Sequence, residues 1–376
     1  MIERYDLAGP AALGVADGVD EATRRYIASQ MDPFTGARSS ADPDVLIERG
    51  PPPAIGELQN PANDGLVTGS DGEALYLRDG DGWCRLPTGD RVSGPARFVL
   101  SGGFALWRAF GSAVRPALQL ALLRSGGVAL HAASVELDGA GIVVAGWSES
   151  GKTETALALI EGGASFLSDK WTVWDAGGEL SAFPIGVGIR RWVLPYLPLL
   201  RKSLTRAARV QFAAAGAADR ASRPLRGRRR GGRLAGLASE AMDRAVALAD
   251  RAALTPTQLR AAYGQTDDPA RRVPVGCIVL LENGPGDELA VHEADPGAAA
   301  ARLARSGVYE RRVWFALQER ARYALAAVAA GPTIEEVVER ERALLEPLLD
   351  ATRLLTVRAP FPTDPRRVAA AIHDRL

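Results

Sequence analysis

The stretch Gly141-Ile-Val-Val-Ala-Gly146-Trp-Ser-Glu-Ser-Gly151-Lys152-Thr153 places a short apolar run directly before a glycine loop. An apolar run of this length is typical of a strand that is buried on both faces of a sheet. Residues 153–161 then carry Ala, Leu and Ile at helical spacing and end at Gly162-Gly163, which predicts a helix with a glycine cap. The order of strand, loop and helix predicts an α/β fold around this segment.

The loop matches the whole pattern G-x-x-x-x-G-K-[ST] between a predicted strand and a predicted helix. Its glycines allow the backbone to curl so that successive N–H groups face phosphate oxygens, and the positive end of the helix adds to the attraction. We expect Lys152 to neutralise the β- and γ-phosphates and Thr153 to offer a hydroxyl to a bridging Mg²⁺. The competing interpretation is a chance glycine turn before a helix. We predict an ATP and Mg²⁺ site built from Gly146, Trp147, Ser148, Glu149, Ser150, Gly151, Lys152, Thr153 and Glu154.

Two further polar residues lie at the ends of predicted strands on either side of the loop. Upstream, strand candidates at 127–137 and 141–146 are joined by the hairpin-like turn Asp138-Gly139-Ala140, and the first contains His131. Downstream, the apolar run at 164–168 ends in Asp169, which could hold Mg²⁺ or accept the proton of an attacking hydroxyl. As alternatives, Asp169 could cap a turn, and a lone histidine on an apolar strand is more often a hydrogen-bonded core residue.

The rest of the chain divides into a small first part and a larger second part. Residues 1–100 are dense in Gly, Pro and Asp with short strand-like runs at 44–47 and 73–77, which predicts a small β-rich N-terminal lobe. An amphipathic helix at 103–123 should lead into a second domain over 101–376. A buried strand at 275–282 should extend a mixed central sheet. The chain from 298 onward, including 333–349, is expected to be mostly helical, with a strand at 353–357 before a terminal helix.

Composition excludes several classes of protein. The chain has 376 residues and 47% hydrophobic residues, enough for a large core. Its 45 basic and 45 acidic residues cancel, which removes any global electrostatic argument for a nucleic-acid or membrane partner. Its two cysteines fit neither a metal nor a redox spacing, and no stretch reaches the length of a membrane span. Together with a start that does not resemble a secretory signal, these features favour a cytoplasmic protein.

A basic insertion is predicted at about 201–262. Its Gly-flanked arginines at 228–230 are typical of a flexible loop, whereas 234–259 returns to helical periodicity. The segment could receive an acidic peptide or a phosphorylated acceptor, or it could be a solvated, mobile loop. Residues 201–233 contain one acidic residue, Asp219. The basic residues of the same stretch are Arg201, Lys202, Arg206, Arg209, Arg220, Arg223, Arg226, Arg228, Arg229, Arg230 and Arg233.

Over about 127–175 the sequence resembles the HPr kinase/phosphorylase group and its wider set of HPr-kinase-like kinases with the PEP-carboxykinase fold. In that family a histidine, a glycine hairpin, a P-loop that continues as G-K-S-E-T-A-L, a glycine and an acidic strand end follow one another. Here the same order is given by Leu130-His131, Asp138-Gly139, Gly151-Lys152-Thr153-Glu154-Thr155-Ala156-Leu157, Gly163 and Ser168-Asp169.

The resemblance implies roles and partners that the residues alone leave open. It implies a PEP-carboxykinase-like P-loop core, Asp169 as general base, and His131 as a partner on the phosphate or substrate side. It also implies transfer to a hydroxyl of a peptide, protein or small molecule, and it raises the expectation of a homo-oligomer. Glu154 occupies the family's Glu position, although a first-turn Glu can simply favour the helix dipole.

Two departures from the family pattern limit the inference. Members that act on HPr show two consecutive acids where this chain has Asp169-Lys170, and an acid and arginine before G-x-G where it has Phe183-Pro184-Ile185. Both departures weaken the inference to HPr itself. Arg190 or Arg191, after the glycines, could supply charge in the transition state or could form surface salt bridges.

The leading prediction is therefore an ATP- and Mg²⁺-dependent kinase in which Lys152 and Asp169 carry the chemistry. The alternative is a nucleotide-binding regulator or scaffold whose chemistry has decayed, which Lys170 in place of an acid favours. A motor or transport ATPase fits poorly because no Q-loop or second signature motif is found. The additional metal ligands of a PEP carboxykinase cannot be placed.

Overall fold

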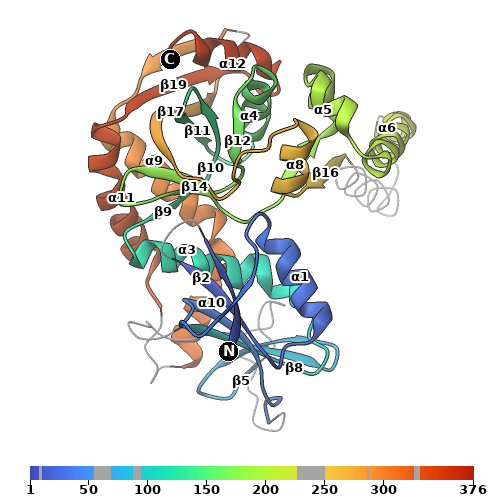
Figure 1. The fold of residues 1–376 in the computed structure, drawn as a ribbon, viewed down its shortest axis with the longest axis vertical. Helices are drawn as coiled ribbons and strands as arrows, with labels where there is room; N and C mark the ends of the chain where they lie inside the picture. The colour runs from blue at the N-terminus through green and yellow to red at the C-terminus, as the bar shows by residue number, and fades with distance from the viewer. Residues whose placement is uncertain (8–10, 55–68, 88–94, 227–249, 286–287, 326–330) are drawn as a thin grey trace.

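The computed structural model describes residues 1–7, 11–54, 69–87, 95–226, 250–285, 288–325 and 331–376. Figure 1 shows an N-terminal sheet with helix α1 on one side of the molecule and, beyond helix α3, a second sheet with helices on both faces. The α/β class with a mixed sheet, as predicted, is confirmed.

The N-terminal part is rich in β-structure, as the sequence predicts. Within the described residues, eight strands form one sheet in the order β3-β1-β2-β4-β8-β7-β6-β5, and α1 (Glu21–Met31) packs its buried Ile27 and Met31 into the core. Asp20 caps α1 by accepting a hydrogen bond from the Thr23 N–H at 2.9 Å. The strands are β1 (Ile2–Asp6), β2 (Ala12–Ala16), β3 (Ala37–Ser39), β4 (Val45–Arg49), β5 (Gly69–Ser70), β6 (Leu75–Asp79), β7 (Gly82–Arg85) and β8 (Ala96–Ser101).

A helical segment follows, later than the sequence predicts. It begins with α2 (Trp107–Ala109) rather than at residue 103, passes through a π-helical turn (Phe110–Val114), and continues as α3 (Arg115–Arg124). Residues 116–123 of α3 are all buried, so this helix lies in the interior between the two sheets.

The second sheet contains nine strands in the described residues. The turn between β10 and β11 is confirmed as a two-residue hairpin, because Leu137 pairs with Ala140 and the left-handed φ angles of Asp138 and Gly139 are 52° and 80°. The strands are β9 (Val128–Leu130), β10 (Ala132–Leu137), β11 (Ala140–Gly146), β12 (Ser165–Ser168), β13 (Thr172–Trp174), β14 (Glu179–Ala182), β17 (Val273–Asn283), β18 (Ala290–Glu293) and β19 (Arg353–Ala359).

The single strand predicted at 127–137 is wrong. The chain breaks at His131, so that β9 pairs with β13 while β10 pairs with β11 and β12. Both halves are apolar and buried. An apolar pattern does not show that its two halves pair with different strands.

The centre of this sheet is parallel. Strands β11, β17 and β19 run in the same direction, with Gly146 beside Leu281, so their carboxyl ends meet at one edge. Helices α4 (Lys152–Glu161) and α12 (Pro365–His373) cover one face, and α9 (Pro296–Glu310) with α11 (Ile334–Asp350) covers the other (Figure 1). Ligands bind at such an edge in open α/β sheets, and the glycine loop lies there. Helix α10 (Arg312–Ala324) follows α9 directly.

The insertion is partly ordered into regular structure. The chain reaches it through β15 (Val187–Arg190), a 3₁₀ turn (Arg191–Tyr196) and α5 (Pro198–Ser203). The insertion then contains α6 (Arg206–Arg226), β16 (Arg251–Leu254) and α8 (Pro256–Ala262). Residues 206–226 form a helix rather than a loop, and Phe212 and Ala215 on it are buried, while the role of this segment in binding an acceptor stays a prediction. The helix predicted at 234–259 is wrong at 251–254, which pair with β15 as a strand; 227–249, with the arginines at 228–230, lie outside the described residues.

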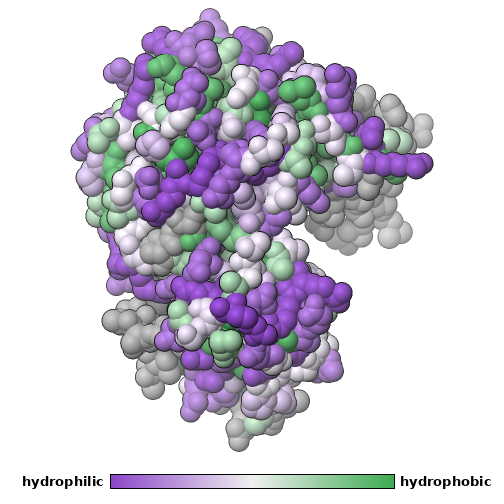
Figure 2. Space-filling view, viewed as in Figure 1, coloured by the Kyte–Doolittle hydropathy of each residue, from purple (hydrophilic) through white to green (hydrophobic). Residues whose placement is uncertain are grey.

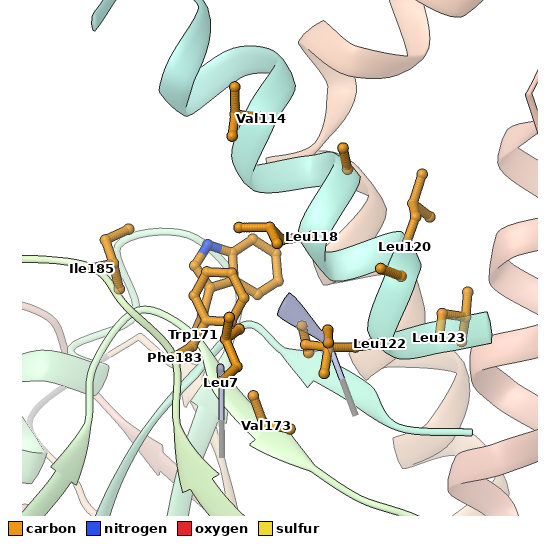
Figure 3. Packing of buried hydrophobic residues seen from close by; sticks show 14 of the residues in the cluster. Leu7, Val114, Leu118, Leu120, Leu122, Leu123, Trp171, Val173, Phe183 and Ile185 are labelled. Atoms are coloured by element: carbon orange, nitrogen blue, oxygen red, sulfur yellow. The ribbon is translucent and has the colours of Figure 1, made fainter. Parts of the chain in front are cut away.

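One apolar core joins the two parts of the molecule. Leu7 from the N-terminal part lies close to Trp171 and Phe183 from the second part, beneath Leu118 of α3 (Figure 3). Two hydrogen bonds of 2.9 Å, from the N–H and the hydroxyl of Thr257 to Asp32, also link the parts. In Figure 2 this face is hollowed between the projecting α5–α6 segment and the N-terminal part. The two sheets thus divide near residue 100, but one apolar core spans both parts of the molecule. The division into two domains stays a prediction.

Candidate phosphate-binding site

The loop between β11 and α4 requires its glycines. Gly146 has φ 149° and Gly151 has φ 97°, both in the region that favours glycine. A Cβ atom on Gly146 would lie 2.7 Å from the Leu281 carbonyl oxygen, and one on Gly151 would lie 3.2 Å from the Phe361 ring. Helix α4 begins at Lys152, so its first N–H groups face the loop, as an anion site at a helix N-terminus requires.

Lys152 is buried at the base of the loop. Its Nζ donates to the carbonyl oxygens of Trp147 at 2.6 Å and Gly146 at 3.1 Å. Burial lowers the pKa of Lys152 to about 8, against the attraction of Asp169 and Glu310. The ammonium group is thus held where phosphate oxygens above the loop would come within its reach.

Thr153 and Asp169 lie side by side, as the sequence predicts. The Thr153 hydroxyl donates to Asp169 Oδ1 at 2.8 Å, and Asp169 is buried at the end of β12. Burial raises the pKa of Asp169, while the Thr153 hydrogen bond opposes this shift. Two adjacent oxygens fit Mg²⁺, which commonly takes one or two protein ligands and completes its shell with phosphate and water. The described residues contain no group of three or more His, Cys, Asp or Glu side chains that could hold a metal by themselves.

His131 lies behind the loop and is held in one orientation. Its Nδ1 lies 2.8 Å from Ser306 Oγ, and the Ser306 hydroxyl donates to the Gly146 carbonyl at 3.3 Å. Burial and the neighbouring Lys152 lower the pKa of His131, so the ring is neutral at pH 7. The other ring nitrogen, Nε2, lies 3.9 Å from Glu310 Oε1.

These residues line one cleft of about 350 Å³. The structure brings together Lys152, Thr153, Asp169 and His131, and it adds residues that sequence reasoning missed. Glu310 ends α9, far away in the chain, and carries no local motif that could have revealed it. The missed residues on the wall of the cleft are Arg251, Ala253, Glu310 and Phe361, and the wall also contains Lys170, Ile185, Gly186 and Gly188, which the sequence analysis considered only as departures from the family pattern.

The remaining predicted residues divide between this cleft and a neighbouring cavity. Residues 148–154 line the cleft, and Glu154 is buried there with a pKa raised by burial. Gly146 and Trp147 instead face a cavity of about 690 Å³ beside α9. The half-exposed Trp147 packs on Tyr309, with ring centroids 4.7 Å apart.

The two arginines that follow the glycines form surface ion pairs. Arg190 pairs with Glu149 of the loop, and Arg191 pairs with Asp250 at 2.6 Å. Arg190 also faces Arg251 directly across the β15–β16 ribbon, so two guanidinium groups border the cleft.

No protein-family model and no curated protein matches this sequence. No helix within the described ranges is long and apolar enough to cross a membrane.

Proposed function

We propose that this protein is a Mg²⁺-dependent kinase that transfers the γ-phosphoryl group of ATP to a hydroxyl of a peptide, protein or small molecule. The observation that carries the proposal is the contact between Thr153 and Asp169, 2.8 Å apart, beside a buried lysine at the start of α4. A phosphate-binding loop, a hydroxyl ligand and a carboxylate thus meet in one cleft, which is the set of groups that phosphoryl transfer requires.

Each residue has a defined task in this mechanism. The loop N–H groups and Lys152 bind and neutralise the β- and γ-phosphates. Thr153 and Asp169 would hold Mg²⁺, which supplies further neutralisation of phosphate charge when bound. Asp169, at the end of β12 beside the start of α4, is also placed to accept the proton of the attacking hydroxyl. His131 fixes the loop through Ser306 and Gly146.

The resemblance to the HPr-kinase-like family supports the proposal, and with it a PEP-carboxykinase-like core. Of the parts that carry the resemblance, His131, the P-loop and Asp169 line one cleft, while the β10–β11 hairpin turn lies at the other end of β11. A cytoplasmic location and a homo-oligomer belong to the proposal as well.

A nucleotide-binding regulator is the second candidate. It is favoured by Lys170, whose ammonium lies 3.4 Å from Glu310 where the family has a second acid. Such a protein would bind ATP through the same loop without transferring phosphate.

ATP turnover with Mg²⁺ distinguishes the two candidates. Wild type and Asp169→Asn would be incubated with an extract of hydroxyl-bearing peptides and metabolites, followed by mass spectrometry for added phosphate. A product that wild type forms and Asp169→Asn does not form supports the kinase, provided both bind ATP equally. ATP binding without hydrolysis or transfer in wild type would support the regulator.

A further inference from the structure

Lys170 lines the cleft and has an unusual backbone conformation. Its backbone lies in the left-handed region, with φ 62°, which is costly for a residue with a Cβ atom. Its side chain is half-exposed and lines the cleft next to Asp169. Strain of this kind persists where the surrounding structure fixes the residue, and it concentrates at functional sites.

Two consecutive residues of one segment face two consecutive residues of another. Lys170 Nζ lies 3.4 Å from Glu310, and the Trp171 ring lies under the Arg311 guanidinium at 5.8 Å. Arg311 is buried and forms an ion pair with the buried Glu341 of α11. The junction of α9 and α10 is therefore fixed from behind, and Glu310 is held at the wall of the cleft where Lys170 meets it.

Lys170 is a second cation on the wall of the cleft that also contains Lys152. It acts electrostatically on both Lys152 and His131, which lie on the inner wall of the same cleft. Asp169 is the neighbour of Lys170 in the chain and the proposed proton acceptor. Two lysines, Lys152 at the start of α4 and Lys170 next to Asp169 in the chain, thus line the cleft that contains the proposed proton acceptor.

We infer that Lys170 is a catalytic residue that contacts the transferring phosphoryl group, and that Glu310 is a positioning residue that holds its ammonium in the cleft. This inference rests on the proposed kinase function. Lys170 stands where the family has a second acid, and this difference then changes the electrostatics of phosphoryl transfer without abolishing transfer.

The chemistry balances without a further reactant. The bond between the γ-phosphorus and the β–γ bridging oxygen of ATP breaks, a bond from the acceptor oxygen to the γ-phosphorus forms, and ADP leaves with the bridging electrons. The acceptor proton goes to Asp169. Lys170 transfers no proton; its charge stabilises the equatorial oxygens, where negative charge is spread in the transition state.

The test needs no knowledge of the acceptor. MgADP with aluminium fluoride mimics the transferring phosphoryl group, so the probe is the affinity for MgADP measured with and without aluminium fluoride. We expect wild type to bind MgADP more tightly when aluminium fluoride is present. In Lys170→Ala the affinity for MgADP alone should stay within about twofold, while the gain from aluminium fluoride should fall by about tenfold or more.

Three variants and one control separate charge from structure. Lys170→Arg should keep most of the gain, and Glu310→Gln should lose part of it with MgADP affinity unchanged. Lys170→Gly relieves the left-handed strain, so it should raise the melting temperature while still losing the gain. Lys202→Ala, an exposed lysine of α5 outside the cleft, is the matched control and should behave as wild type.

The outcomes are distinct. If wild type does not bind MgADP, the proposed function itself fails. If wild type binds MgADP but gains nothing from aluminium fluoride, or if Lys170→Ala keeps the full gain, the inference about Lys170 is overturned while nucleotide binding stands.

Discussion

In the proposed kinase the charge of Lys152 is expected to decide phosphate binding, and the pKa of Lys152 makes this charge sensitive to pH. The pKa of about 8 means that the ammonium loses its proton as pH rises through 8. Bound phosphate favours the charged form, so affinity should fall above pH 8. We predict that the Kd for MgADP rises by about tenfold between pH 8 and pH 9.5, measured by calorimetric titration.

The matched variant for this pH dependence is Lys152→Arg. Its guanidinium keeps its proton over the whole range, so its Kd should stay nearly constant even if it binds more weakly at pH 7. A wild-type Kd that does not change with pH would contradict the role of the Lys152 charge.

The buried, ionised carboxylate of Asp169 is expected to lower the stability of the folded protein at pH 7. Its folded pKa is raised by burial, so the folded state holds the proton more tightly than the unfolded state. The stability that the folded protein gains from protonated Asp169 is present below the unfolded pKa of about 4. It is lost as pH rises through the pKa of Asp169 in the folded state.

Asp169→Asn should therefore unfold at higher urea concentration than wild type at pH 7, with a smaller difference at pH 5. The Asn carbonyl can still accept the 2.8 Å hydrogen bond from Thr153. Lower stability of the variant at pH 7 would show that the ionised carboxylate is well compensated in the folded protein.

At the residue scale, sequence reasoning reached what lies within one local segment. Helix α4 and the short strand β12 lie between Thr153 and Asp169 in the chain. The G-x-x-x-x-G-K-[ST] pattern and the next strand end were therefore sufficient to assign both residues to one site. Glu310 and Ser306 lie on α9, and only the packing of that helix against the sheet brings them to His131 and Lys170.

At the scale of elements, the end of α4 offers a clean test of backbone conformation. The Ala164 and Gly163 N–H groups donate to the carbonyls of Leu159 and Ile160, and Gly163 has φ 111°. A Cβ atom at Gly163 would meet nothing within 4 Å, so strain is its sole cost. Gly163→Ala should lower the free energy of unfolding by about 1 kcal/mol in urea titration without changing MgADP affinity.

The predictions of strands and turns were correct where the local sequence pattern by itself identifies the element. The hairpin at Asp138-Gly139 and strand β17 are confirmed, because turn residues and a long apolar run identify them directly. The split at His131 and the strand β16 could not be predicted, since their partners are distant strands β13 and β15. Non-local pairing leaves little trace in a local pattern.

At the scale of the whole molecule, the shared core should make the two parts unfold together. Leu7 is 2% exposed and belongs to the same apolar cluster as Trp171 and Phe183 of the second part (Figure 3). We predict that wild type melts in a single calorimetric transition. Leu7→Ala should lower the unfolding free energy of the whole chain by about 2–4 kcal/mol, because it opens a cavity in that core.

The control is Leu199→Ala, which truncates a leucine that is 49% exposed on α5 and should cost less than about 0.5 kcal/mol. The decisive measurement is the number of transitions in Leu7→Ala. If both sheets lose structure together at the lower temperature, the core makes one folding unit of the phosphate site and the N-terminal sheet. Two transitions, of which Leu7→Ala shifts only one, would instead show that residues 1–100 form a domain that folds independently of the site.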